Sequence, residues 1–472
     1  MHVLVVEDDE DFVEEVGRVL SDFSEIDLVV ARSRDSAFSS IGNDFFDLII
    51  LDLRIPTVDG GTDDDPVHGR AVFAKARAAA PGTPIFVITG SPAEGFIGEM
   101  LAQQQQVDIW SSGKTVGTVD FLKKYEFDKF PEKLAPLAHA VRGLSEVELD
   151  RGALALKIED DRLLRIFSRK FHAAKCVVSQ LGGGLSGAMI VRLRITDTGG
   201  APVLDAVAKI GPPGDVTDEC DRFDRLVSRL DPNSTPRKLA HLQYGARDRA
   251  GVFYGLADGF DLTAFQVAGG ESGRPVETVR GVAFALRRWS ERVPETRREI
   301  REIRRRLMSD GDLAEVVRTF SLAWIEDFES KYIQTRWCCV HGDLHGSNVL
   351  TSATGQSVII DFGDVGEGPA SLDPVTLELC LLFHPQSPIK GLPWPSRDNS
   401  ANWGNLTRYL AGCPCAAFIE ECRVWARSVA AGNREIAACA YSYLVRQLKY
   451  DDTDKPLALS LLGGVRAFFD AT

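Results

Sequence analysis

Two short stretches, far apart in the chain, combine side chains that could handle phosphate. Near the N-terminus, VLVVEDDE places Glu7 and Asp8 directly after an apolar run. Much later, VHGDLHGSNVL contains Asp343 and Asn348, and VIIDFGD brings Asp361 soon after. Carboxylate and carboxamide oxygens are ligands that suit Mg²⁺, which often binds together with phosphate groups. The sequence therefore predicts two separate sites for phosphate chemistry.

The early stretch belongs to a region in which apolar runs end repeatedly in reactive side chains. DLIILDL contains Asp52, PIFVITG contains Thr89 and TVDFLKK ends at Lys124, with amphipathic stretches of helical length between the runs. Strands that alternate with helices predict a parallel sheet, whose active residues gather where the strands end. There two or three carboxylates could form an oxygen site for Mg²⁺, so that Asp52 could attack a phosphoryl group as a nucleophile. Lys124 could then pair with the phosphate, and the Thr89 hydroxyl could donate to it.

By these motifs, in this order and spacing, residues 1 to about 145 resemble the receiver domain of a two-component response regulator. The resemblance implies a flavodoxin-like α/β fold with a parallel five-stranded sheet. It makes Glu7, Asp8 and Asp52 the ligands of Mg²⁺. It also makes Asp52 the phosphate acceptor, Thr89 the switch hydroxyl and Lys124 the phosphate-sensing lysine. Phe121 would be the rotating aromatic residue. A sensor histidine kinase or a phosphotransfer protein would supply the phosphate.

Three features depart from the receiver pattern. GGTDDDPVHG at 60–69 reads as an insertion after the second active strand, and the 90–119 stretch is longer than usual. Tyr125 follows Lys124 where receivers commonly have proline. Because such domains dimerise and signal through the neighbouring surface, a homodimer through the receiver stays open, as does its pairing mode. An inactive receiver-like scaffold is the alternative to a working receiver.

The segment after the predicted receiver reads as a stiff connector. EKLAPLAHAVRGL at 132–144 would be the last receiver helix. Beyond it, Leu163, Phe167 and Phe171 recur at helical spacing, which predicts a helix that packs into a core. Since no Pro-rich or Gly/Ser-rich spacer interrupts 146–172, the connector could transmit a change from the receiver.

From residue 176 the pattern changes to strands that look antiparallel. CVVSQLGGGLSGAMIVRLRI reads as a strand, a glycine-rich turn and a strand, in which Ser186 could offer its N–H and hydroxyl to phosphate. The glycines that free this backbone for close approach are Gly182, Gly183, Gly184 and Gly187. Taken alone, the pattern equally describes an ordinary hairpin turn. The next strand carries Lys209. Considered alone, a lysine at this position would usually be a charge on an edge strand. The following helix offers Glu219, Asp221 or Asp224 as its carboxylate partner.

VHGDLHGSNVL and VIIDFGD form the most specific signal in the second half. Phosphoryl transfer needs a carboxylate to orient or deprotonate the acceptor, and oxygen ligands to hold Mg²⁺ against the phosphates. Asp343 fits the first role, and Asn348 and Asp361 fit the second. A tight loop can return Asp343 and Asn348 to one site, and an apolar strand before Asp361 aims it there. The alternative is a metal-free loop of polar caps.

With these motifs in order, residues 176 to about 465 resemble the aminoglycoside phosphotransferase and choline kinase branch of the protein-kinase-like fold. HGDLHGSN is closer to that branch than to protein kinases, which typically carry HRD. The resemblance implies an α+β bilobal domain in which Ser186 and the glycines cover ATP and Lys209 holds its phosphates. Asp343 would be the catalytic aspartate. Glu219 is our choice as the partner of Lys209.

Other parts of the second half are less specific. The resemblance makes LADGFD at 256–261 the hinge and Asp373 a support of the active-site loop. The arginine-dense stretch at 285–307 is helix-like and reads mainly as a solvated, ion-paired face, with a lid for an anionic substrate as the alternative. Trp394 and Trp403 are expected to pack the lobe rather than to form a substrate wall.

We therefore expect four parts along the chain. Residues 1–145 form the receiver, 146–172 a helical connector, 173–262 the N-lobe and 263–472 the C-lobe with the catalytic loop.

Bulk composition limits the remaining classes. The chain has 472 residues, 44% of them hydrophobic, and a net charge of −14, which disfavours a nucleic-acid partner. No run approaches the roughly 18 apolar residues of a membrane span, and no secretory signal pattern opens the chain, so we expect a cytoplasmic protein without a membrane partner. The nine cysteines show no zinc spacing, which fits a reduced compartment.

The expected function is a response regulator with an enzymatic output. Phosphorylation of Asp52 would control an Mg²⁺- and ATP-dependent kinase that acts on an unknown hydroxyl-bearing acceptor. The alternative is a nucleotide-binding pseudokinase scaffold that the receiver switches. A DNA-binding output finds no support, because no basic helix-turn-helix pattern occurs.

Overall fold

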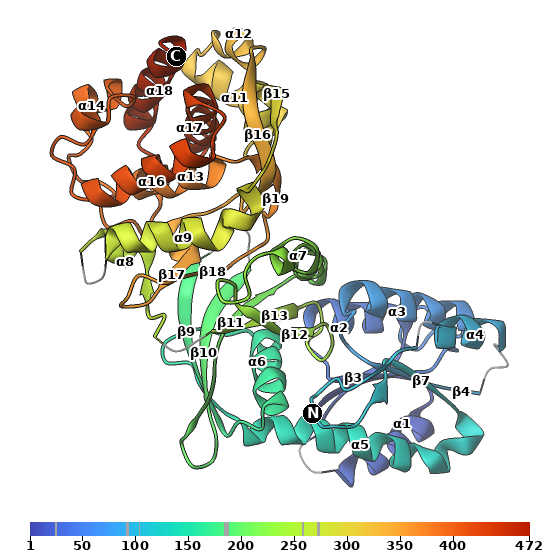
Figure 1. The fold of residues 1–472 in the computed structure, drawn as a ribbon. Coiled ribbons are helices and arrows are strands. Elements are labelled where there is room, and N and C mark those ends of the chain that lie inside the picture. The colour runs from blue at the N-terminus through green and yellow to red at the C-terminus, as the bar shows by residue number, and fades with distance from the viewer. Residues whose placement is uncertain (24–25, 91–93, 103, 184–187, 257–258, 271–273) are drawn as a thin grey trace. The chain divides into compact units, whose positions relative to one another are not determined.

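The computed structural model describes the chain except residues 24–25, 91–93, 103, 184–187, 257–258 and 271–273 (Figure 1). It forms two compact units, and each unit consists of one long and one short segment of the chain. Unit 1 comprises Met1–Thr217 with Lys238–Gly255, and unit 2 comprises Asp218–Arg237 with Leu256–Thr472.

Unit 1 begins with a parallel five-stranded sheet, as predicted for a receiver. In sheet order its strands are β2 (Asp27–Ala31), β1 (His2–Val6), β3 (Leu48–Leu51), β4 (Ile85–Thr89) and β7 (Val119–Lys123). Alternate side chains enter two cores, because successive strand residues point to opposite faces. On one face pack α1 (Glu10–Ser21) and α5 (Phe130–Arg142). On the other pack α2 (Arg34–Asn43), α3 (Pro66–Ala79) and α4 (Glu94–Ala102).

The long 90–119 stretch contains a small hairpin besides α4. Its strands are β5 (Gln106–Val107) and β6 (Val116–Gly117), and the Asp108 carboxylate ties the turn by accepting the N–H groups of Ser112 and Gly113 at 2.8 Å each. Trp110 in this turn is 1% exposed and packs in the same core as Ile166 of α6 (Ile158–Lys170). The extra residues therefore extend the receiver core toward the connector.

In the 60–69 stretch, residues 60–65 form a loop that is held by carboxylates of the same loop, and residues 66–69 begin α3. Asp63 accepts the backbone N–H of Thr57 at 3.1 Å, and a single bridge pairs Ile55 with Asp65. Asp65 then caps α3, accepting the N–H of Val67 at 2.8 Å.

A second, six-stranded sheet completes unit 1. Its order is β12 (Arg237–Leu242), β13 (Ala250–Leu256), β11 (Pro202–Gly211), β10 (Met189–Thr196), β9 (Lys175–Gly183) and β8 (Glu148–Asp150). The predicted connector helix is α6, and its Leu163 and Phe167 are buried as expected, with Phe167 stacked on Phe253 at 4.0 Å. The edge strand β8 lies within the connector and pairs in parallel with β9.

Unit 1 also contains direct bonds between the receiver and the second sheet. Gly82 donates its N–H to the carbonyl of Arg247 at 2.7 Å, and Gly245 donates its N–H to the carbonyl of Gly82 at 2.8 Å. Arg162 of α6 pairs at 3.1 Å with the Asp47 carboxylate, which is fully buried. The connector is thus packed against both sheets rather than extended through solvent.

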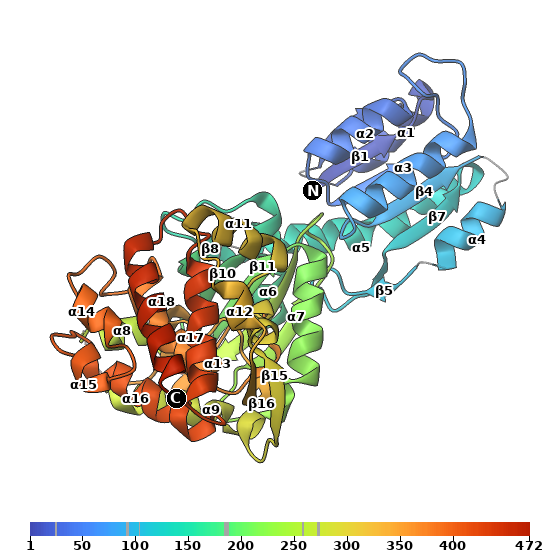
Figure 2. The same cartoon turned by 90° about the horizontal axis from the view of Figure 1, so that it is seen from above.

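Unit 2 is mainly helical (Figure 1). Its first part holds the C-terminal portion of α7 (Pro213–Arg225), then β14 (Leu262–Thr263), α8 (Ala264–Ala268) and α9 (Pro275–Ser290). Next come β15 (Glu295–Glu299), α10 (Ile300–Arg305), α11 (Asp310–Phe320), α12 (Ile325–Glu329), β16 (Tyr332–Val340), β17 (Val349–Thr351), β18 (Ser357–Ile359) and β19 (Gly366–Pro369). The last helices are α13 (Leu372–Phe383), α14 (Arg397–Ala401), α15 (Leu406–Tyr409), α16 (Ala416–Val429), α17 (Asn433–Gln447) and α18 (Lys455–Asp470). Helix α17 packs against both α13 and α18 (Figure 2).

The prediction of one helical stretch over 285–307 is wrong. Helix α9 ends at Ser290, β15 pairs with β16, and only then does α10 begin. Pro294 lies at the interruption and cannot donate a helical hydrogen bond. The expectation of a solvated face holds only in part, because Arg304 is 1% exposed. Trp394 and Trp403 are buried, as expected for residues that pack the lobe.

Two further features of the described residues concern helix length and the cysteines. None of the helices there is long and apolar enough to cross a membrane. None of the nine cysteines, all of them described, forms a disulfide, and only Cys339 and Cys413 are partly exposed.

Candidate functional site

The first candidate site lies at the carboxyl edge of the receiver sheet. Glu7 follows β1 and Asp52 follows β3, and the Asp52 N–H donates to the carbonyl of Val6 at 2.9 Å. Lys124, directly after β7, places its Nζ 2.7 Å from Glu7 Oε2 and 2.7 Å from Asp52 Oδ2. Both carboxylates are buried. The structure therefore brings these three predicted residues together.

The remaining predicted receiver residues lie near the same edge. Asp8 follows Glu7 and is exposed, whereas Thr89, the last residue of β4, is buried. Phe121 is half-buried in β7. Tyr125, which replaces the usual proline, is 77% exposed.

The charges of this cluster are not balanced. Burial, together with the neighbouring Asp52 charge, raises the pKa of Glu7 to about 7. For Lys124, burial acts to lower the pKa, but the charges of Asp52 and Glu7 outweigh it and raise the pKa above its usual value. Two crowded carboxylates with one cation are a hard, electron-rich donor set, which suits Mg²⁺. Among the described residues, no three His, Cys, Asp or Glu side chains form a ready-made metal site, so a bound ion would need ligands beyond those two.

The predicted nucleotide-binding residues fall in different parts of the structure. Lys209 lies in β11, opposite Ile190 of β10, and Gly182 and Gly183 lie at the end of β9. Gly184, Ser186 and Gly187, like part of the predicted hinge, lie outside the described residues. Glu219 is buried in the part of α7 that belongs to unit 2, so its pairing with Lys209 stays a prediction.

The second candidate site is the loop that follows β16. Asp373, which is almost completely buried at the start of α13, accepts the N–H of His341 at 2.8 Å and the N–H of Gly342 at 3.0 Å. Gly342 has a φ of +85°, and a Cβ there would lie 2.5 Å from the carbonyl oxygen of Asp364. Only glycine fits this turn, and the buried carboxylate fixes it. Asp373 thus supports the loop.

The same loop brings Asp343, Asn348 and Asp361 together. Asn348 donates from Nδ2 to the carbonyl of Asp343 at 3.0 Å, and Ile360 donates its N–H to the carbonyl of Asn348 at 3.0 Å. Asp361 is the next residue after Ile360, so this hydrogen bond places it close to Asn348. Its φ of +63° is rare for a residue with a side chain, and such backbone outliers concentrate at functional sites.

Asp343 also has neighbours that the sequence did not reveal. Arg446 Nη1 donates to Asp343 Oδ1 at 3.2 Å, and His345 Nε2 lies 3.7 Å from Asp343 Oδ2. Burial alone would raise the pKa of Asp343, but the charges of His345 and Arg446 outweigh it and hold the pKa below its usual value. Asp343 is thus a carboxylate at neutral pH.

An aromatic group packs behind this loop. His345 stacks on Phe265 and lies 4.4 Å from His384 between ring centroids. Burial lowers the pKa of His345, and it lowers that of His384 to about 4. The motif itself contains His345, and its spacing from Asp343 was the one signal that could have drawn attention to it.

Family models match two separate regions of the chain. Residues 3–109 match a response regulator receiver domain, and residues 177–378 match a phosphotransferase enzyme family. The chain thus contains a receiver domain and a domain of the phosphotransferase family. This confirms both resemblances and the predicted fold classes.

Solved structures resemble the two domains separately. The receiver domain from Methanospirillum hungatei JF-1 is 20% identical, with 29% of this chain and 96% of that chain covered and a TM-score of 0.21. The receiver domain of the sensor histidine kinase PA1611 from Pseudomonas aeruginosa PAO1, solved with magnesium in its active-site cleft, is 19% identical over 28% and 94% of the two chains, with a TM-score of 0.20. The phosphotransferase APH(2")-IIia, solved with GDP and kanamycin, is 14% identical over 61% and 93%, with a TM-score of 0.34. No curated protein matched the chain.

Proposed function

We propose that this protein is a response regulator whose receiver accepts a phosphoryl group on Asp52 and whose second domain transfers the γ-phosphate of ATP to a hydroxyl group. The observation that carries the proposal is the loop in which Asn348 bonds to the backbone of Asp343 and lies beside Asp361. This is the donor set that phosphoryl transfer requires, delivered by one tight turn and one strand end.

In the receiver, Asp52 is the proposed nucleophile. Glu7, Asp8 and Asp52 would hold Mg²⁺, which would supply positive charge against the incoming phosphoryl group. Lys124 already contacts both Glu7 and Asp52, so it is placed to pair with the phosphate that forms on Asp52. A sensor histidine kinase or a phosphotransfer protein is the proposed phosphate donor.

In the second domain, Asp343 is the proposed acceptor of the hydroxyl proton. Its lowered pKa keeps it ionised, and Asn348 and Asp361 would hold the Mg²⁺ that neutralises the phosphates. Lys209 and Glu219 are proposed to position ATP, together with the glycine-rich turn that contains Gly182, Gly183, Gly184, Ser186 and Gly187. We also propose the boundaries 1–145, 146–172, 173–262 and 263–472 for the four parts.

Nucleotide binding and turnover of three variants test this proposal. Asp361→Ala should abolish the rise in melting temperature that Mg-ATP gives the wild type. Asp343→Asn should keep that rise but lower release of phosphate from ATP by about 10²–10⁴-fold. Asp364→Ala removes an exposed carboxylate in the same loop and serves as the matched control.

GTP should be tested beside ATP, because one similar structure holds GDP. Stabilisation by either nucleotide without turnover would favour the switchable pseudokinase scaffold. A wild type that is neither stabilised by nor active on ATP or GTP would contradict a nucleotide-dependent function altogether.

A further inference from the structure

Helix α17 places the guanidinium of Arg446 against Asp343. The proposed mechanism above assigns no role to this cation. Arg446, near the end of α17, donates from Nη1 to Asp343 Oδ1 at 3.2 Å. Its Nε donates to the hydroxyl of Tyr450 at 3.0 Å. The guanidinium is therefore held at both edges, and only 20% of the Arg446 side chain is exposed. This differs from a surface arginine that meets a carboxylate by chance.

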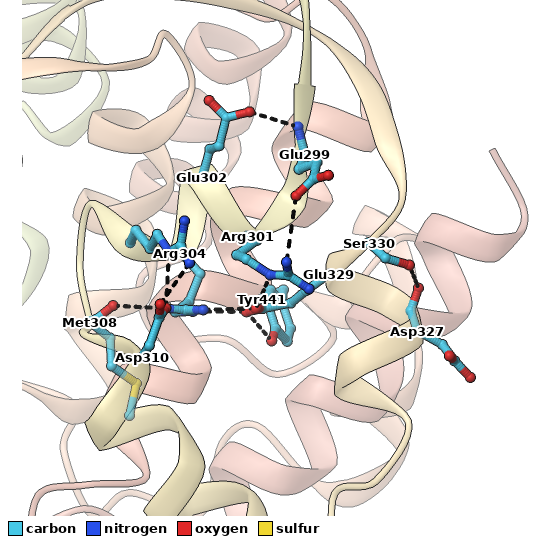
Figure 3. Close-up of polar contacts among 11 residues, drawn as sticks. Glu299, Arg301, Glu302, Arg304, Met308, Asp310, Asp327, Glu329, Ser330 and Tyr441 are labelled. Atoms are coloured by element: carbon cyan, nitrogen blue, oxygen red, sulfur yellow. Dashed lines mark hydrogen bonds and ion pairs between the residues drawn. The ribbon is translucent and has the colours of Figure 1, made fainter.

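The position of Arg446 is fixed by the anchoring of its helix. At the start of α17, the buried Glu435 accepts both the N–H and the hydroxyl of Ser371, at 3.0 and 2.9 Å. In the middle, the Tyr441 hydroxyl donates to Glu329 at 2.9 Å (Figure 3). Polar bonds at the start, middle and end of the helix thus limit how far Arg446 can move from the catalytic loop.

This contact divides the roles of the two Asp343 oxygens. Oδ1 is taken by Arg446, whereas Oδ2 faces His345 at 3.7 Å, which is beyond hydrogen-bond distance. The His345 ring in turn packs against His384 and Phe265. Of the two oxygens, Oδ2 is therefore the one that an acceptor hydroxyl can reach without displacing a strong partner.

We propose that Arg446 is a positioning residue for phosphoryl transfer, which turns Asp343 so that Oδ2 meets the acceptor hydroxyl. The inference rests on the proposed function. In the step, the acceptor oxygen forms a bond to the γ-phosphorus while the bond from that phosphorus to the bridging oxygen breaks. The nucleoside diphosphate leaves with the electron pair, and the acceptor proton passes to Asp343 Oδ2. Arg446 touches neither substrate and acts through Asp343.

Steady-state release of phosphate from Mg-ATP, with water as the acceptor, tests this role. Arg446→Met should lower kcat by about tenfold or more and change KM for ATP less than about twofold, because the loss lies in the oriented carboxylate rather than in nucleotide binding. Arg446→Lys, which keeps a charge near Oδ1, should recover part of that loss. Arg434→Met removes an exposed arginine from the same helix and should match the wild type.

A double variant separates positioning from a merely structural effect. If Arg446 acts through Asp343, adding Arg446→Met to Asp343→Asn should lower kcat no further. Additive losses would overturn the role, as would a kcat that Arg446→Met leaves unchanged. Melting temperatures of all variants show whether each one folds, and a loss of kcat that Arg446→Lys does not restore at an unchanged melting temperature also counts against it. Absence of turnover in the wild type would instead overturn the proposed function, and this inference with it.

Discussion

Glu7, Asp52 and Lys124 show how strongly one buried charge can depend on its neighbours. Lys124 forms ion pairs with both carboxylates, and the side chains of Glu7 and Asp52 are buried. The cluster holds one cation and two carboxylates. When no divalent cation is present, its negative charge is therefore most readily neutralised by proton uptake on Glu7.

Stability without divalent cations should therefore fall as pH rises. Glu7 has a pKa of about 7 in the folded protein and an ordinary value of 4.5, so between these values the folded state holds a proton that the unfolded state has lost. The stabilisation is complete below 4.5 and is lost as pH rises through 7, on the order of 3 kcal/mol. Chemical denaturation in EDTA at several pH values from 4 to 8 measures it.

Glu7→Gln should flatten this pH dependence, while the exposed Glu14→Gln should leave it unchanged. Added Mg²⁺ should flatten the wild-type profile as well, because a bound cation favours the ionised carboxylate. Identical profiles for wild type and Glu7→Gln in EDTA would rule out the proton on Glu7.

At the scale of elements, a buried ion pair joins α10 to α12 in unit 2. Arg304 and Glu329 are 2.8 Å apart, with side chains only 2% and 3% exposed, and Tyr441 of α17 donates to the same carboxylate (Figure 3). Three helices thus meet at one carboxylate. Such a pair contributes little over an apolar contact, but removal of one partner leaves a buried charge.

Glu329→Gln should lower the free energy of unfolding by about 3 kcal/mol or more. The neighbouring Arg305, which pairs with Asp310 on the surface at 2.6 Å, offers the matched control. Arg305→Ala should give no measurable loss, because solvent screens that pair. Chemical denaturation of both variants gives the comparison, and equal losses would show that burial does not govern these pairs.

The short helical turn Gly346–Asn348, in the loop after β16, requires that residue 346 carry no side chain. A Cβ on Gly346 would lie 2.5–2.8 Å from three ring atoms of Phe265. Gly346→Ala should therefore cost about 1–3 kcal/mol of stability, and Phe265→Leu in the same chain should restore part of it. Melting temperatures of the two single variants and the double variant test this coupling. Losses that simply add would mean that the loop moves aside instead.

The sequence was informative where chemistry sits at the end of a strand. Asp52, Thr89 and Lys124 each end an apolar run, so both the parallel sheet and the edge where these polar residues gather could be predicted from the pattern. Asp343, Asn348 and Asp361 lie within two short motifs, and one turn joins them. In both candidate sites, short stretches of sequence were therefore enough to predict which residues lie together.

Long-range partners could not be read in this way. Arg446 lies 103 residues from Asp343, and nothing near either residue indicates the contact. The arginines of 285–307 recur at a spacing that fits a helix, yet pairing with β16 makes part of that stretch a strand. Tertiary contacts outweighed local preference there.

At the scale of the whole molecule, the receiver and the second sheet share bonds and core within unit 1. The Gly82 bonds join the receiver to the loop after β12. The Arg162–Asp47 pair and the packing of Trp110 with Ile166 join it to α6, which also packs against the second sheet. Residues that share one core tend to unfold together, so a ligand that binds one part stabilises the other.

Beryllofluoride with Mg²⁺, bound at Asp52, should therefore slow hydrogen exchange in β10 and β11 as well as in β1 and β3. Asp52→Ala should abolish both effects. Exchange that slows in the receiver strands alone would show that the two sheets open independently, and would argue against control of the second domain by the receiver through this contact.

The short strand β8 has a practical consequence for how such proteins can be recombined. The chain that leaves the receiver becomes the edge strand of the next sheet only six residues after α5, with Glu148 opposite Lys175. The segment that joins the two domains is therefore itself part of the second sheet and is not a free linker. A receiver exchanged as a cassette at residue 145 would bring a foreign entry into β8, so a working chimera should keep Glu148–Asp150 with its sheet.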